Sequence, residues 1–393
     1  MPTPLPDYFQ FAPFVDAEML SEVWGAADSL AAEALALEDG RSAGDALVAM
    51  VRLMGGRGLL RFVTSKEYGG AYDALSVRSL CLVRERLGHA SPLVELAFAM
   101  QGLGSYPLTH AGGSMADAWL PKVVAGEAVA AFALTEAEAG SDLNGISTRA
   151  HRDGDEWVLS GEKVFISNAP VADMFVVFAR TSDEGPASRA LSAFLVPGKH
   201  VGVSTEATQV LGGHPIGTLR LEGARLPADH LVGEEGRGLG LALATLGRFR
   251  TSVGGAALGF AQRALDESVA HVKSRRQFGA PLAELDAVRG RIGDMACLLE
   301  SSRLLVYRSA MALDGGADRP ASTRMGSMAK LVATESAQKI IDSAVQLHGG
   351  RGVQSEHIVA RLYEEVRALR IYEGTSDIQR VLIAREVLRD TRT

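Results

Sequence analysis

The spacing of apolar residues changes twice along this chain of 393 residues, and no other feature restricts its fold as strongly. In residues 16–126, apolar side chains recur every three or four positions, which is typical of helices that bury one face. In residues 128–232 they alternate with polar side chains, which is typical of strands. The helical spacing returns after Gly240. The chain is therefore expected to form helices, then strands, then helices again.

The middle segment carries two signs of a sheet. Alternating apolar pairs occur at Trp157/Leu159, Val164/Ile166 and Leu219/Leu221. Residues 174–179 form an almost unbroken apolar run, which predicts a strand that is buried on both faces.

Three long apolar stripes follow in the last part of the chain. They extend over residues 258–272, 285–310 and 325–345, and each stops at a segment that contains glycine. Their length is typical of helices in a bundle rather than of short surface helices. A final helix is expected to start near Ser376.

Helices and strands are segregated, with no regular alternation of strand and helix. This order favours an α+β fold and argues against a doubly wound nucleotide-binding sheet. We expect a helical domain over residues 1–128, a β domain over residues 129–238 and a helical domain over residues 239–393.

Composition and charge exclude several classes of protein. Hydrophobic residues make up 47% of the chain and charged residues 22%, so the chain can bury a core and is not expected to be disordered. The formal net charge is −7, so the chain lacks the basic surface that nucleic acids and anionic membranes attract. Neither is expected as a partner.

The cysteines and the opening residues bear on location. Cys81 and Cys297 lie far apart and away from any histidine cluster, so no disulfide framework or zinc site is expected, and a reducing cytoplasm fits. Residues 1–7 lack the features of a signal peptide, and no apolar run approaches the ~18–20 residues that span a bilayer. Arginine outnumbers lysine by 33 to 7, which points to a bacterial source.

Two segments of the predicted β domain suit a flat cofactor. Residues 132–142 run from a strand end into a loop where Thr135, Gly140 and Ser141 offer hydroxyl and backbone N–H groups. Residues 161–168 alternate, so Phe165 and Ser167 share one face and can stack on and hydrogen-bond a planar ring. Taken singly, an ordinary polar loop and a core Phe beside a surface Ser explain these segments about as well.

Two segments of the helical part suit a diphosphate and a catalytic acid. Residues 274–279 place arginines at a helix end, where they complement the helix dipole and can also neutralise a diphosphate. Glu373 precedes Gly374 and a Thr/Ser helix cap, so its carboxylate lies beside a helix start. A purely structural role remains the simpler explanation of each segment by itself.

Taken together and in this order, these segments resemble the acyl-CoA dehydrogenase family of flavoproteins over nearly the whole chain. The matching stretches are Leu134-Thr135-Glu136, Ala139-Gly140-Ser141-Asp142, Gly161-Glu162-Lys163, Ile166-Ser167-Asn168, Arg276-Gln277-Phe278-Gly279, Gln346-Leu347-His348-Gly349-Gly350-Arg351-Gly352 and Tyr372-Glu373-Gly374-Thr375. The resemblance implies an N-terminal helical domain, a middle β-barrel-like domain and a C-terminal four-helix bundle. It also implies a homotetramer or dimer, with FAD as cofactor.

The resemblance assigns roles to individual residues. Those implied to contact the flavin are Phe132, Leu134, Thr135, Gly140, Ser141, Phe165, Ile166 and Ser167. Those implied to hold the diphosphate and adenosine of a neighbouring subunit's FAD are Arg275, Gln277, Phe278, Gln346, Gly349 and Gly350, and Thr375 and Asp377 match further FAD contacts. Those implied to contact the substrate are Ser141, Arg250, Tyr372 and Gly374.

The implied reaction is oxidation of an acyl-CoA to the trans-2-enoyl-CoA. Glu373 matches the base that takes the α-proton, and the β-hydride passes to flavin N5. Some relatives carry the base at the position matched by Phe249, which cannot accept a proton, so Glu373 has no rival. An electron-transferring flavoprotein is the implied electron acceptor, and fatty acid metabolism the implied setting.

Some positions depart from the family pattern. Ala137-Glu138 replaces a Pro-Gly-like pair, Phe165 stands where Trp is frequent, and Asp286 stands where Gln commonly meets the adenosine. Glu95 lies close to where relatives that act on dicarboxylyl thioesters place arginine, which suggests that it disfavours a terminal carboxylate. A Glu95 that simply faces solvent is the simpler expectation.

Two other functions stay open on the sequence. The thioester can be borne on an acyl carrier protein instead of CoA, which leaves the Glu373 chemistry unchanged. The chain can also be a flavin-binding protein without dehydrogenase turnover, although its Tyr-Glu-Gly-Thr segment and net charge of −7 argue against this. Chain length and branching of the acyl group do not follow from these residues.

Overall fold

Residues 14–390 are described by the computed structural model, and they divide into two units that are each assembled from separate stretches of chain. The helical unit contains residues 14–35, 77–95 and 247–390, and the sheet unit contains residues 36–76 and 96–246. The opening residues 1–7, in which no signal peptide is expected, lie outside the described part. Mixed α and β structure agrees with the predicted α+β class.

The sheet unit is built on the segment whose apolar residues alternate. Its strands are β1 (Ala130–Ala133), β2 (Arg149–Asp153), β3 (Glu156–Ser167), β4 (Met174–Arg180), β5 (Leu191–Pro197), β6 (Val203–Ala207), β7 (Ile216–Pro227) and β8 (Leu231–Val232). They pair in the order β6-β7-β3-β2-β4-β5-β8, and β1 runs parallel to β4. The order leaves β6 and β8 at the two ends, so the pairs among the described strands do not close into a barrel.

The core of the sheet unit explains the unbroken apolar run. β4 is buried from Met174 to Ala179 because it has strands on both sides and packed side chains on both faces. Trp157 of β3 packs edge-on against Phe194 of β5, with ring centroids 5.1 Å apart. Burial of each such side chain contributes roughly 1.5–3 kcal/mol, so this core holds the strand ends in place.

Helices and short turns complete the sheet unit. Its helices are α3 (Ala43–Gly56), α6 (Ser114–Val124) and α7 (Ala187–Ala190), and α5 (Pro92–Ala111) and α8 (Gly238–Ser274) contribute residues to both units. Short 3-10 turns lie at η3 (Leu59–Val63), η4 (Lys66–Tyr68), η5 (Leu143–Gly145), η6 (Ala169–Val171) and η7 (Ala228–His230). The Ser42 hydroxyl caps α3 by accepting from the Asp45 N–H at 3.2 Å.

The helical unit contains the three long helices that the apolar stripes predict. Its elements are α1 (Ala17–Met19), the π-helical turn η2 (Leu20–Trp24), α2 (Gly25–Ala36), α4 (Val77–Ala90), α8, α9 (Asp286–Asp314), α10 (Arg319–His348), α11 (Ile358–Leu369) and α12 (Ser376–Asp390). A short hairpin of β9 (Arg276–Gln277) and β10 (Ala280–Pro281) follows α8. The turn η8 (Leu282–Glu284) leads into α9, and the turn η9 (Gly349–Val353) follows α10. α12 begins at Ser376, as predicted.

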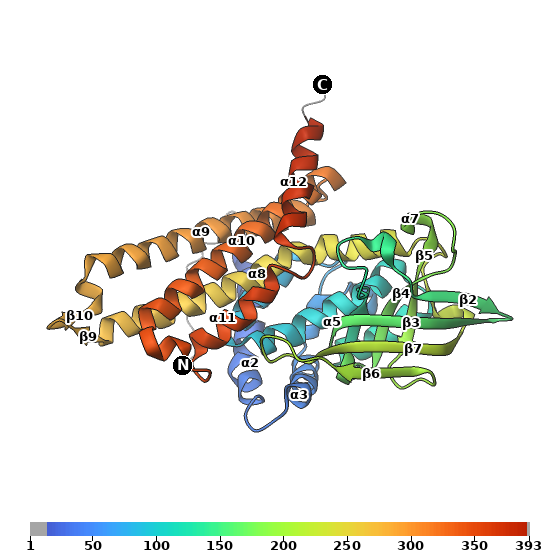
Figure 1. Cartoon of the computed structure of the whole chain (residues 1–393), viewed down its shortest axis with the longest axis horizontal. Helices are drawn as coiled ribbons and strands as arrows, with labels where there is room; N and C mark the ends of the chain where they lie inside the picture. Colours follow the sequence, from blue (N-terminus) through green and yellow to red (C-terminus); the bar gives the residue numbers. More distant parts are fainter. Residues whose placement is uncertain (1–13, 391–393) are drawn as a thin grey trace. The chain divides into compact units, whose positions relative to one another are not determined.

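Helix α10 is the central element of this unit. It contacts α9, α11 and α12, and Figure 1 shows α9 and α10 lying side by side. Its buried face is lined by small and branched residues such as Ala333, Ala337 and Ile340, which let neighbouring helices approach closely. Helix α11 was not predicted, although Val359, Leu362, Val366 and Leu369 are buried at helical spacing.

Candidate active site

A tight turn between α11 and α12 carries Glu373. Its backbone is left-handed, with φ 53° at Glu373 and φ 91° at Gly374. Glycine adopts this conformation readily, whereas it is strained for glutamate. The Thr375 hydroxyl accepts from the Ile378 N–H at 3.2 Å, which is the helix cap that the Thr/Ser pair predicts.

Two buried side chains hold the carbonyl groups of this turn. Lys330 Nζ of α10 donates to the Gly374 oxygen at 2.8 Å. Gln379 Nε2 of α12 donates to the same oxygen at 2.8 Å and to the Glu373 oxygen at 3.2 Å. Both side chains are fully buried, so the turn is fixed from two helices.

The surroundings of the Glu373 carboxylate favour a proton acceptor. Burial raises the pKa of Glu373, against the opposing charges of Arg84, Lys330 and Arg250. Its Oε2 is buried and has no hydrogen-bond partner within residues 14–390. A carboxylate with a raised pKa and one free oxygen in a water-poor place is suited to general-base chemistry.

The residues predicted to contact the substrate in this unit gather around the same carboxylate. Burial lowers the pKa of Arg250, although the charge of Glu373 opposes this, and Arg250 Nε has no hydrogen-bond partner in the described part of the chain. Burial raises the pKa of Tyr372 well above its usual range, and Glu373 contributes to the shift. The structure therefore brings Arg250, Tyr372 and Gly374 together with Glu373.

Glu95 does not face solvent, which corrects the simpler expectation. It is 2% exposed and forms an ion pair with Arg84, which is also 2% exposed. Arg84 Nη1 donates to the Ser252 hydroxyl at 2.8 Å. Because Arg84 offsets its charge, Glu95 is not an isolated acid.

In the sheet unit, the loop after β1 carries the predicted flavin contacts. Phe132 and Leu134 are mostly buried, Thr135 is half-buried, and Gly140 and Ser141 are exposed. The strand end that runs into a loop is thus formed as predicted, and it leaves small and hydroxylated residues accessible.

A buried ion pair anchors this loop to β3. Lys163 Nζ donates to Glu136 Oε1 at 2.7 Å and to the Leu134 oxygen at 3.1 Å. Glu136 also accepts from the backbone N–H groups of Ser147 and Thr148 at 2.7 and 3.0 Å. Burial acts to raise the pKa of Glu136, but the charge and hydrogen bond of Lys163 prevail and lower it to about 2.

Phe165 and Ser167 lie at an irregular point of β3. The register against β7 shifts between Lys163 and Ile166, and Phe165 has φ 55°. Phe165 is 59% exposed, Ser167 is half-buried and Ile166 is buried. The aromatic ring is therefore accessible, as stacking on a planar group requires, although regular alternation does not produce it.

The remaining predicted cofactor contacts belong to the helical unit. Arg275 follows the end of α8, and Gln277 and Phe278 lie in the β9–β10 hairpin, where Phe278 is 91% exposed with φ 54°. Gln346, Gly349 and Gly350 are exposed at the end of α10, Thr375 is half-buried and Asp377 is exposed. The rings of His271 and His348 lie 4.4 Å apart, so the ends of α8 and α10 are adjacent.

Each unit offers features that suit one part of a large planar cofactor with a charged chain. Phe165 in the sheet unit and Phe278 in the helical unit are both exposed in strained backbone, and Arg275 lies three residues before Phe278. FAD needs an aromatic ring against which its flavin can stack and cationic or N–H donors for its diphosphate.

Several residues of these sites were missed in the sequence. They are Arg84, Glu136, Lys163, Lys330 and Gln379. The spacing of apolar residues did not reveal the two lysines. The alternating pair Val164/Ile166 places Lys163 on the other face of its strand, yet Lys163 is buried, and Lys330 is buried on a face of α10 that the predicted stripe does not mark. A buried lysine needs a partner, and the structure supplies one in each case.

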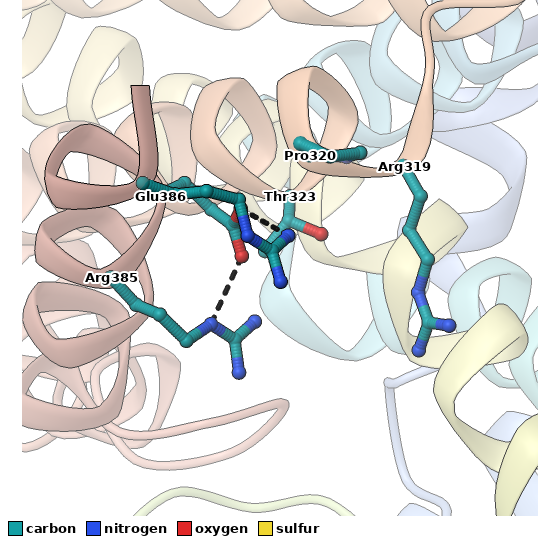
Figure 2. A pocket seen from close by; sticks show the side chains of 6 residues that line it. Arg319, Pro320, Thr323, Arg385 and Glu386 are labelled. Carbon is teal, nitrogen blue, oxygen red and sulfur yellow. Dashed lines mark hydrogen bonds and ion pairs between the residues drawn. The ribbon is translucent and has the colours of Figure 1, made fainter. Parts of the chain in front are cut away.

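A cavity of about 300 Å³ lies between the start of α10 and the end of α12. Figure 2 shows Arg319 and Arg385 on opposite sides of it and Glu386 paired with Arg385. Glu386 also forms an ion pair with Arg389. It is lined by Arg319, Pro320, Thr323, Arg385, Glu386 and Arg389. None of the predicted site residues lines it.

Residues 14–390 contain neither a membrane-spanning helix nor a metal-binding cluster. No helix there is long and apolar enough to cross a bilayer. No group of three or more His, Cys, Asp or Glu side chains is arranged to hold a metal ion in the same residues.

Family models match almost the whole chain. The N-terminal, middle and C-terminal domains of acyl-CoA dehydrogenase match residues 22–127, 131–224 and 236–388. The three matches follow the order of helices, sheet and helices described above.

Individual relatives are similar over most of their length. Cyclohexane-1-carbonyl-CoA dehydrogenase of Geobacter metallireducens is 36% identical over 85% of this chain and 87% of its own. The human mitochondrial short-chain specific acyl-CoA dehydrogenase is 37% identical over 88% of this chain and 84% of its own. The solved butyryl-CoA dehydrogenase of Megasphaera elsdenii superposes with a TM-score of 0.88 at 28% identity, over 95% of this chain and 99% of its own.

Proposed function

The chain belongs to the acyl-CoA dehydrogenase family of FAD-dependent oxidoreductases, and from this we propose that Glu373 is the base that starts oxidation of an acyl-CoA. The observation that carries the proposal is the Glu373 carboxylate, whose pKa is raised by burial and whose Oε2 is buried and unpartnered within residues 14–390, among three cations. An α-proton of a thioester is weakly acidic, so its removal needs such a base.

The residues around Glu373 supply the rest of the proton step. The α-proton moves to a carboxylate oxygen, and negative charge develops on the thioester oxygen. The Glu373 N–H makes no backbone hydrogen bond among the described residues, so it can donate to that oxygen. Arg84, Arg250 and Lys330 keep the site positive while this charge develops. Bound FAD would supply the acceptor for the β-hydrogen and its electron pair.

The residues of the sheet unit are proposed to hold the flavin. Phe165 offers a ring face, and Thr135, Gly140 and Ser141 offer donors in a loop that the Glu136–Lys163 pair fixes. Arg275, Phe278, Gln346 and Gly350 are proposed to hold the diphosphate and adenosine, in a homotetramer where a neighbouring subunit contributes them.

The wider setting is proposed on the same basis. The substrate is a CoA thioester, as the names of the similar enzymes indicate for those proteins. An electron-transferring flavoprotein is proposed to reoxidise the enzyme, in bacterial fatty acid metabolism. The free cysteines, buried Cys81 and exposed Cys297, fit a reducing cytoplasm.

Anaerobic flavin bleaching tests this function. A panel of acyl-CoAs that vary in length and branching is added to the holoenzyme, and at least one is expected to bleach the flavin absorbance. Glu373→Gln should abolish the bleaching and retain FAD, because it removes the base and keeps the side-chain volume. Bleaching at an unchanged rate in Glu373→Gln would contradict the assignment of the base. If no acyl-CoA bleaches the flavin, the proposed activity is wrong.

A further inference from the structure

We infer that Lys330 and Gln379 are positioning residues, which hold the backbone of the Glu373–Gly374 turn so that the carboxylate points at the substrate. The inference rests on the proposed role of Glu373. Neither side chain belongs to the sites predicted from the sequence.

Lys330 lies at a buried position, where a lysine is unusual. It is 0% exposed on the packed face of α10, among neighbours such as Ala329, Ala333 and Thr334. Its ammonium group donates to the Gly374 oxygen at 2.8 Å. Taking an ammonium group out of water is costly, so a buried lysine that meets a backbone carbonyl marks a place where that carbonyl must be held.

Gln379 holds the same turn from the other side. Its Nε2 donates to the Gly374 oxygen at 2.8 Å and to the Glu373 oxygen at 3.2 Å. The packing is close, because a Cβ on Gly374 would lie 2.6 Å from this nitrogen. Both carbonyl groups of the turn are thus fixed by donors from α10 and α12.

The turn requires this support because Glu373 is left-handed, with φ 53°. Without the two donors, the residue can relax to negative φ, and its carboxylate would swing away from its present direction. Displacement of a reacting group by about 1 Å can lower a rate about 10²-fold. The donors therefore affect the rate without touching the substrate.

An alternative role for Lys330 is charge alone. Charged groups face Glu373 from several elements: Arg84 of α4, Glu95 of α5, Arg250 of α8 and Lys330 of α10. If Lys330 acts only by its charge, its removal shifts the pH dependence and weakens the stabilisation of the negative charge that develops on the thioester oxygen. Gln379 carries no charge, so a Gln379 variant separates the two roles.

The experiment compares Lys330→Met and Gln379→Leu holoenzymes with the wild type, using an acyl-CoA that bleaches the wild-type flavin. We expect each variant to lower kcat about 10²-fold. KM and the FAD content should change little. Lys339→Met is the matched control, because Lys339 is exposed on the same helix, and its kcat should equal that of the wild type.

The pH profile adds a second readout. In Lys330→Met, the loss of a nearby cation should shift the acidic limb of flavin reduction to higher pH. In Gln379→Leu, the limb should stay in place while the plateau falls. A wild-type plateau in both variants would overturn the positioning role.

Two further outcomes are decisive. A lower rate explained entirely by loss of folded, FAD-loaded protein would show a structural role and overturn the inference. If Lys330→Met does not fold, Lys330→Arg takes its place, because it keeps the charge on a longer side chain. A wild-type kcat in both folded variants, Lys330→Arg and Gln379→Leu, would then overturn the positioning role. Failure of the inference is distinguishable from failure of the proposed function, because Glu373→Gln tests the base independently.

Discussion

At the scale of single residues, the Arg84–Glu95 pair places two opposite charges in the interior near Glu373, the proposed base. Each side chain is 2% exposed, and Ser252 satisfies a further nitrogen of Arg84. A buried pair of this kind contributes little net stability, but removal of one partner leaves an unpaired buried charge. Arg84 is also the largest attractive charge that opposes the raised pKa of Glu373.

Single and double substitutions of this pair are therefore expected to differ. Glu95→Gln and Arg84→Met should each lower the free energy of unfolding by about 3–5 kcal/mol, because the remaining charge stays buried. The double variant should lose less than the sum of the two. Urea unfolding of the four proteins measures this, and strictly additive losses would show that the charges are not coupled.

At the scale of elements, the Glu136–Lys163 pair joins the loop after β1 to β3. Glu136 accepts from Lys163 and from two backbone N–H groups, so the loop has a fixed path before any cofactor binds. Burial lowers the pKa of Lys163 to about 8, although the charge of Glu136 opposes this. The pair is thus an internal anchor rather than a surface contact.

This anchor predicts how the sheet unit responds to acid. The folded pKa of Glu136 is about 2, below the value of about 4.3 in an unfolded chain, so its stabilisation is complete above about pH 4.3 and is lost as pH falls toward 2. Glu136→Gln should flatten the decline of unfolding free energy in this window. Lys163→Met should weaken FAD retention, because the loop loses its anchor. An unchanged acid profile in Glu136→Gln would contradict this role.

The helices and strands were largely predictable, and their contacts were not. The stripes in residues 258–345 predicted α8, α9 and α10 because burial of one helix face leaves a local pattern. The bond from Lys330 to Gly374 joins residues 44 positions apart, and no local spacing contains it. The left-handed Phe165 was likewise hidden, because regular alternation continues through the irregular register of β3.

At the scale of the whole molecule, the two units carry different titrating groups. The rings of His271, His348 and His357 lie close together in the helical unit, in tilted pairs with centroids 4.4 and 4.8 Å apart. Burial, followed by the charge of His348, lowers the pKa values of His271 and His357, and Arg351 adds to both shifts. Glu267 opposes the shift at His357. In the sheet unit, Glu136 is a buried carboxylate whose pKa is lowered, so its stabilisation is lost only at a lower pH.

Acidification should therefore loosen the helical unit before the sheet unit. Histidines whose folded pKa is lowered stabilise the fold fully above about pH 6.5, and this stabilisation is lost as pH falls below that value. The stabilisation by Glu136 is lost only below about pH 4.3. Hydrogen exchange at pH 5 should rise first near the ends of α8 and α10, and His271→Phe should reduce the rise. Earlier exchange in β1 and β3 would contradict this order.

The turn at Glu373 also sets a condition for protein engineering. Its shape is held by donors from two helices rather than by its own residues alone. A transplant of the short Tyr-Glu-Gly-Thr loop into another scaffold would carry the proposed base without these donors. A designer who wishes to reuse this base must therefore copy three separated pieces of chain: the loop, one turn of α10 around Lys330 and the first turn of α12.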